Sequence, residues 1–73
     1  MKIGDYIRQE NTDSTALIFE KLKNGSFKAY VHDYRGRIVI KSIRGWYPIP
    51  EIISKEDVPD KIIAKFNKYL SQN

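Results

Sequence analysis

The chain has 73 residues, a net charge of +4 and no cysteine. Its length predicts one domain, which buries only about 60% of the surface that the unfolded chain exposes. The absence of cysteine excludes disulfides and thiolate metal sites, and no apolar run approaches the roughly 20 residues of a membrane span. We therefore expect a soluble, cytoplasmic domain that gains burial by forming a homodimer.

Positive charge is concentrated in residues 21–44, which carry seven lysines and arginines and a single acid, Asp33. This segment has a net charge of +6, and the rest of the chain has −2. A localised positive field indicates a polyanionic partner. The alternative is a surface that only keeps the protein in solution.

The N-terminal residues, 1–14, predict an edge strand or an ordered arm. The next residues, 15–23, are rich in β-formers and end at Asn24-Gly25, a strong signal for a two-residue hairpin turn. The return strand covers 26–34. Arg35-Gly36 predicts a second two-residue turn, and the antiparallel hairpins then continue to residue 46.

Two prolines in residues 47–54 exclude a central strand, although 51–54 can form a short edge strand. Asp57 is the predicted N-cap of a helix over 57–71, with Lys61, Lys65 and Lys68 on its solvated side. The whole chain, 1–73, is therefore predicted to be one α+β domain, in which an antiparallel β-sheet of three to five strands (a meander) packs on one C-terminal α-helix. The apolar stripe of the helix comprises Val58, Ile62, Ile63, Phe66, Tyr69 and Leu70.

Strand side chains alternate between the two faces of a sheet, so the turns predict which residues share a face. Two-residue turns would pair Val31 with Ile18 on one side and with Ile40 on the other. We expect the resulting apolar face to receive the helix. It holds Ile18, Leu22, Phe27, Ala29, Val31, Ile38 and Ile40.

The opposite face is predicted to be basic and aromatic. Cations beside flat rings are typical of a surface that stacks unpaired bases and contacts their phosphates. Alternatively, Tyr30 and Tyr34 pack against neighbouring strands. The face holds Phe19, Lys21, Lys23, Lys28, Tyr30, His32, Tyr34, Arg37, Val39 and Lys41.

Strict alternation past Lys41 would place Ile43 in solvent. We therefore predict a one-residue bulge at Lys41-Ser42, which returns Ile43 to the core and adds Arg44 and Trp46 to the basic face. For Trp46, burial under the following prolines or in a dimer interface is an equal alternative.

Residues 31–47, VHDYRGRIVIKSIRGWY, resemble the central hairpin of the positive cofactor four (transcriptional coactivator) family of single-stranded-DNA-binding proteins. In that family a valine, a basic residue, an acid and an aromatic lead through a Lys-Gly-Lys turn into an apolar strand. That strand ends in isoleucine, arginine, a variable residue and two aromatics. The match needs one inserted residue, at the predicted bulge. The family's linker is shortened here to PIPE, and residues 1–14 have no clear counterpart.

The resemblance implies a homodimer whose two sheets form channels for single strands, with a role in transcription or replication. It assigns base stacking to Tyr34, phosphate contacts to the two turn arginines and to Arg44, and further stacking to Trp46 or Tyr47. Combined with the basic face, the predicted site for single-stranded DNA or RNA comprises Lys21, Lys28, Tyr30, His32, Tyr34, Arg35, Arg37, Lys41, Arg44, Trp46 and Tyr47.

The second interpretation is a small protein-interaction module. The segment AYVHDYRG (29–36) also resembles the AYVPDLPG segment of HicB-type antitoxins, although histidine and arginine replace both prolines. An inhibitor protein from a mobile element would fit the same size, with the aromatic face as a protein-binding patch.

The sequence offers little support for catalysis. His32 is the only histidine, and neither a cysteine nucleophile nor a phosphate-cradling glycine loop is present. We expect a binding protein that is not an enzyme, with no metal, no cofactor and no membrane partner.

Overall fold

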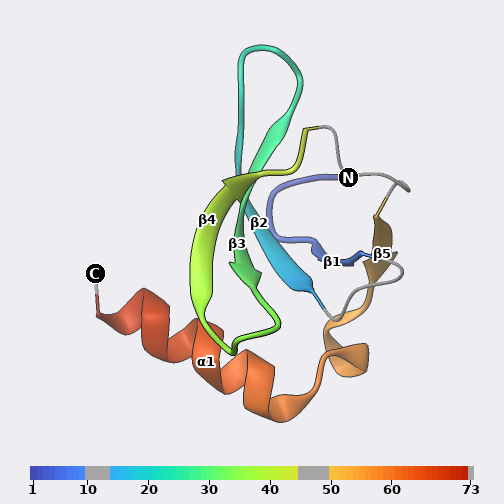
Figure 1. Cartoon of the computed structure of the whole chain (residues 1–73). Coiled ribbons are helices and arrows are strands. Elements are labelled where there is room, and N and C mark those ends of the chain that lie inside the picture. The colour runs from blue at the N-terminus through green and yellow to red at the C-terminus, as the bar shows by residue number, and fades with distance from the viewer. Residues whose placement is uncertain (10–13, 45–49, 73) are drawn as a thin grey trace.

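The computed structural model describes residues 1–9, 14–44 and 50–72. It has an α+β fold, in which a five-stranded antiparallel sheet of order β4-β3-β2-β1-β5 packs on one C-terminal helix (Figure 1). The predicted fold class is confirmed. The strands are β1 (Tyr6–Arg8), β2 (Thr15–Lys21), β3 (Phe27–His32), β4 (Ile38–Ser42) and β5 (Glu51–Ile53), and the helix is α1 (Asp60–Ser71).

β1 lies inside the sheet, whereas the sequence predicted an edge strand or an arm in this region. Ile7 pairs with Ala16 of β2 on one side and with Ile52 of β5 on the other, both antiparallel. The short strand predicted within 51–54 is the actual edge, as β5. Two short strands far apart in the sequence therefore extend the sheet beyond its hairpins.

The β3–β4 turn contains three residues rather than the predicted two. The N–H of Asp33 donates to the carbonyl oxygen of Arg37 at 2.9 Å, and the N–H of Gly36 donates to that of Asp33 at 3.0 Å. Such a loop needs a residue with positive φ in its third position. Gly36, with φ of +78°, provides it.

The extra loop residue shifts β4 by one residue from its predicted register. Val31 pairs with Val39 instead of Ile40, and His32 pairs with Ile38. A shift of one residue turns every side chain of a strand to the other face. Ile38 and Ile40 therefore lie on the side predicted to be basic and aromatic.

The bulge predicted at Lys41-Ser42 is absent, because β4 pairs regularly with β3 through Ser42. Ile43 is nevertheless buried, since the shifted register already directs it to the core. The irregular register lies in β2 instead, between Ile18 and Glu20. Phe19 is therefore left unpaired in β2. The β2–β3 turn also has three residues rather than the predicted two.

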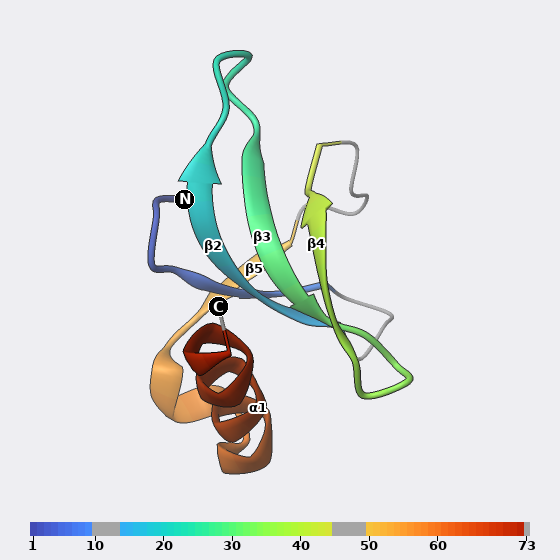
Figure 2. The same ribbon diagram turned by 90° about the vertical axis from the view of Figure 1, so that its left-hand side faces the viewer.

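The inner face of the sheet forms a hydrophobic core of its own. β1 crosses the hairpin strands at a steep angle, so the sheet curls around this face (Figures 1 and 2). Ile7, Ala16 and Ala29 are fully buried there without help from the helix. The curled sheet therefore covers its own inner face, which the sequence predicted to receive α1. The inner core comprises Ile7, Ala16, Ile18, Ala29, Val31 and Ile43, with Phe27 and Val39 packed against it.

α1 covers the outer face, opposite to the prediction. Phe66 is only 1% exposed, and its ring centroid lies 6.1 Å from that of Tyr6 on β1. The register shift contributes Ile38 to this face, and β1 contributes Tyr6. The outer core comprises Ile53, Val58, Ile62 and Phe66, with Tyr6, Leu17, Tyr30, Ile38 and Ile63 packed against it.

The helix begins at Asp60, later than predicted. Asp57 instead ends a short 3₁₀ helix, η1 (Lys55–Asp57), and its carboxylate accepts a hydrogen bond from Ser54 Oγ at 3.0 Å. Val58 is extended, with φ of −88° and ψ of 126°, because a residue before proline avoids the helical region. Pro59 is therefore the N-cap, and only the predicted end of α1 at residue 71 is confirmed.

We expect Gly36→Ala to destabilise the protein more than the matched variant Gly25→Ala. Both residues have positive φ, where a Cβ costs about 1–2 kcal/mol. No atom lies within 4 Å of a Cβ added at Gly25, whereas Lys65 Nζ lies 2.8 Å from one added at Gly36. The excess loss should be small, about 0.5 kcal/mol, because the flexible, exposed Lys65 side chain has to shift from its place beside the Gly36 carbonyl. Urea denaturation measures both variants, and equal losses would contradict this expectation.

Candidate nucleic-acid interface

Asp33 organises the β3–β4 turn through its side chain. Its Oδ1 accepts hydrogen bonds from the N–H groups of Arg35 at 2.9 Å and of Arg37 at 3.0 Å. Aspartate is favoured at the first position of such turns because its carboxylate satisfies backbone groups of the loop. The backbone that carries Tyr34 and Arg35 at the tip is therefore held in one conformation.

A cleft of about 310 Å³ lies against this turn, on the side of the inner face. It brings together four of the predicted site residues, Tyr34, Arg35, Arg37 and Lys41. Three cations thus share the cleft with one carboxylate, that of Asp33. We call this the turn cleft. Its other lining residues are Gln9, Ser14, Val31 and Val39.

Tyr34 is the most exposed of the large apolar or aromatic side chains that the structure describes, at 80%. The Nε of Arg35 donates to its hydroxyl at 3.0 Å, and the guanidinium carbon lies 5.3 Å from the ring centroid. This contact orients the ring while it remains open to solvent. A ring and a guanidinium held together can stack on a base and contact a phosphate.

The carboxylate in the turn cleft offsets only part of its positive charge, because one acid faces three cations. The N–H of Arg37 lowers the pKa of Asp33, and the N–H of Arg35 and both guanidinium groups act in the same direction. Arg37 Nε lies 3.8 Å from Asp33 Oδ2. Asp33 is therefore ionised and engaged with its own turn, while Arg35 and Lys41 have no carboxylate within ion-pair distance among the described residues.

The predicted aromatic face is not available as a stacking surface. Tyr30 stacks on Phe19 at 4.1 Å and meets the edge of Tyr69 on α1 at 5.4 Å, both between ring centroids. His32 lies on the same face, beside the helix lysines that influence its pKa. The prediction failed because the helix packs on this face, so the rings of Tyr30 and His32 serve packing between sheet and helix.

Two further predicted residues lie away from the turn cleft, near the β2–β3 turn. Lys28 Nζ is 3.8 Å from Glu20 Oε2, which partly neutralises it. Lys21 Nζ lies 6.0 Å from the ring centroid of Phe27, towards the inner face. The structure therefore does not join these lysines to the arginines of the β3–β4 turn.

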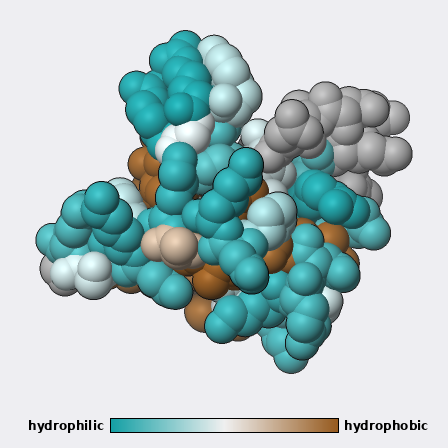
Figure 3. Space-filling view, turned by 90° about the horizontal axis from the view of Figure 1, so that it is seen from below, coloured by the Kyte–Doolittle hydropathy of each residue, from teal (hydrophilic) through white to brown (hydrophobic). Residues whose placement is uncertain are grey.

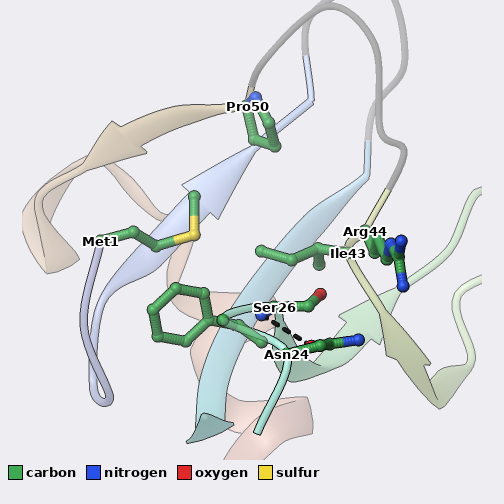
Figure 4. A pocket seen from close by; sticks show the side chains of 8 residues that line it. Met1, Asn24, Ser26, Ile43, Arg44 and Pro50 are labelled. Carbon is green, nitrogen blue, oxygen red and sulfur yellow. Dashed lines mark hydrogen bonds between the residues drawn. The ribbon is translucent and has the colours of Figure 1, made fainter. Parts of the chain in front are cut away.

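Arg44 lines a different cavity of about 390 Å³ at the open end of the curled sheet (Figure 4). Met1 and Pro50 approach this cavity from other segments, and Ile43 borders it beside Arg44. Arg44 is thus separated from the turn cleft. The remaining two predicted residues, Trp46 and Tyr47, lie outside the described residues.

The sequence reasoning missed Gln9 and Ser14, which line the turn cleft, because their place depends on the pairing of β1 with β2. Lys65 is exposed on the helix, as predicted, and its Nζ also donates to the carbonyl oxygen of Gly36 at 2.8 Å, a contact that the sequence did not indicate. Viewed from the side of α1, the surface is predominantly hydrophilic, with apolar residues visible between its projections (Figure 3). In the sequence, the spacing of Lys61, Lys65 and Lys68 along the helix was the only signal that pointed to the position of Lys65.

Comparison with models of known protein families found no match, and comparisons with curated proteins and with solved structures found none either. Within the described residues, no helix has both the length and the apolar content that a membrane crossing requires. In the same residues, no three potential ligands among His, Cys, Asp and Glu come together as a metal site would need. Inferences about function therefore depend on the geometry of this chain.

We expect the free energy of unfolding to fall as the pH decreases below 6.5, because of His32. Burial, and next the charge of Lys65, lower the pKa of His32 from 6.5. The unfolded state then takes up the proton more readily, so protonation favours unfolding. His32→Gln should lack this part of the pH dependence in urea denaturation between about pH 7.5 and about pH 5.5.

The pKa of Asp33 is lowered from 3.8, so its own contribution to stability is lost only at lower pH and does not overlap with that of His32. Parallel pH profiles of the wild type and His32→Gln would contradict the assignment to His32.

Proposed function

We propose that this protein binds single-stranded nucleic acid, DNA or RNA, at the turn cleft. The observation that carries the proposal is the joint placement of an exposed ring, Tyr34, with Arg35, Arg37 and Lys41 around one cleft. Cations that follow a backbone, beside a ring that accepts bases, form the arrangement by which proteins bind single strands. The proposal involves binding alone, without catalysis or a cofactor.

The exposed ring favours a single strand over a duplex. A base can stack on Tyr34 only when it is unpaired, because the bases of a duplex are already stacked on each other. The arginines and Lys41 would contact phosphates of any sequence, so most of the affinity should be electrostatic. A salt-sensitive protein with weak sequence preference is the expected behaviour.

The resemblance to the positive cofactor four family supports this proposal at three positions. It assigns stacking to Tyr34 and phosphate contacts to Arg35 and Arg37, and these residues share the turn cleft. The proposed binding surface differs from the sheet face inferred from the sequence, because α1 covers Tyr30 and His32. The surface is therefore centred on the turn and not on the middle of the sheet.

A protein-interaction module is the second candidate, and the free edge of β4 favours it. Within residues 1–9, 14–44 and 50–72, β4 pairs with β3 alone, and Ile40 on its outer face is 51% exposed. An exposed edge strand can pair with a strand of another protein or of a second copy of this chain. A mass measurement in solution detects a homodimer, and a stoichiometric protein that copurifies from the native host would favour the antitoxin-like or inhibitor role.

Tyr34→Ala should weaken binding of a fluorescent oligothymidylate by about 1–3 kcal/mol, because one base loses its stacking partner. Tyr34→Phe is the matched control, since it keeps the ring and should keep most of the affinity. Fluorescence anisotropy at two salt concentrations measures both variants. The proposal is wrong if the wild type shows no salt-sensitive binding at low ionic strength, or if Tyr34→Ala binds as well as Tyr34→Phe.

Arg37→Ala should reduce the slope of log affinity against log salt by about 0.7, the value for one phosphate contact to a single strand. Arg8→Ala is a control with the same change of charge. Arg8 pairs with Glu51 at 3.2 Å and is not among the residues that line the turn cleft, so its loss should leave the slope unchanged. Equal slopes for the two variants would exclude a phosphate contact by Arg37.

A further inference from the structure

A second groove of about 320 Å³ lies on the other side of the β3–β4 turn, between the turn and the C-terminal half of α1. Lys65 and Lys68 line it from the helix, and Ile38 lines it from the sheet. We call this the helix groove. Gly36, Tyr69 and Gln72 complete its lining. Like the turn cleft, it combines cations with a ring and an apolar side chain.

Among the described residues, no acid balances the charge of the helix groove. No carboxylate lies within ion-pair distance of Lys61, Lys65 or Lys68 among the described residues. Besides burial, which is the largest cause, the charges of Lys65 and then Lys61 lower the pKa of His32. The field of the α1 lysines therefore extends to the strands of the β3–β4 hairpin.

Gly36 lies between the two grooves. It lines the helix groove, and its neighbours Arg35 and Arg37 line the turn cleft. Gly36 has no side chain, and Lys65 Nζ lies over it, bound to its carbonyl oxygen at 2.8 Å. A cation thus stands at the crossing point itself, so positive charge is continuous from the turn arginines to α1.

We propose that the helix groove is a second subsite for the same nucleic-acid strand, which leaves the turn cleft, crosses the turn at Gly36 and continues along α1. Lys65 and Lys68 contact its phosphates, and the apolar floor at Ile38 accepts a base or a sugar. This inference rests on the proposed function and extends it. It predicts a binding site longer than the turn cleft, within the range of about 4–16 nucleotides known for small single-strand-binding folds.

The test compares fluorescent oligothymidylates of about three and about twelve nucleotides. Lys68→Ala should weaken binding of the longer strand by about two- to fivefold, because one exposed ionic contact is lost. It should also reduce the salt slope for that strand by about 0.7, while the short strand, which fills only the turn cleft, is unaffected. Alanine is a good helix former, so the fold is not at risk.

Lys55→Ala is the matched control. It removes the same charge from η1, outside both grooves, and should change neither affinity. If Lys68→Ala equals Lys55→Ala on the longer strand, or if the wild type binds both lengths with the same affinity and slope, the second subsite is refuted while the proposed function stands. If the wild type binds neither strand, both proposals fail. If Lys68→Ala weakens both lengths equally, the helix groove is not a separate subsite.

Discussion

The hydrogen bonds that close the β3–β4 turn decide the arrangement of the rest of the molecule. Asp33 accepts two backbone N–H groups and Gly36 takes up positive φ, so the loop holds three residues. That count sets the register of β4, and the register determines which side chains face inward. Val39 and Ile43 then complete the inner core, while Ile38 joins the outer one. A local backbone requirement thus controls the long-range packing of sheet and helix.

The two cores explain why the aromatic residues of β3 are structural. The curled sheet closes the inner core without the helix, and α1 is left to cover the outer face, where it meets Tyr30 through Tyr69. A small domain has little apolar surface to bury, and packing of large rings on the helix side increases that burial. Among the described residues, the exposed ring of Tyr34 consequently lies outside this packing, at the tip of the β3–β4 turn beside Arg35.

The turn that sets the register also carries the proposed binding site, and it connects that site to the helix. Lys65 of α1 is bound to the carbonyl oxygen of Gly36, and its charge lowers the pKa of His32 beneath it. One exposed hydrogen bond thus links α1 directly to the turn. Stability and binding depend on the same few residues, so measurements of one should accompany those of the other.

The amino-acid sequence alone predicted the α+β class, the approximate extent of the hairpins and the end of the helix, because these depend on contacts between near neighbours. It also placed Tyr34, Arg35 and Arg37 together at one turn, since residues within four positions of a tight turn cannot lie far apart. The face that receives α1 depends instead on contacts between distant segments and on the length of one loop. β1 and β5 meet across most of the chain to curl the sheet, and one extra loop residue reverses the faces of β4. Neither effect leaves a signal in the periodicity of a single strand.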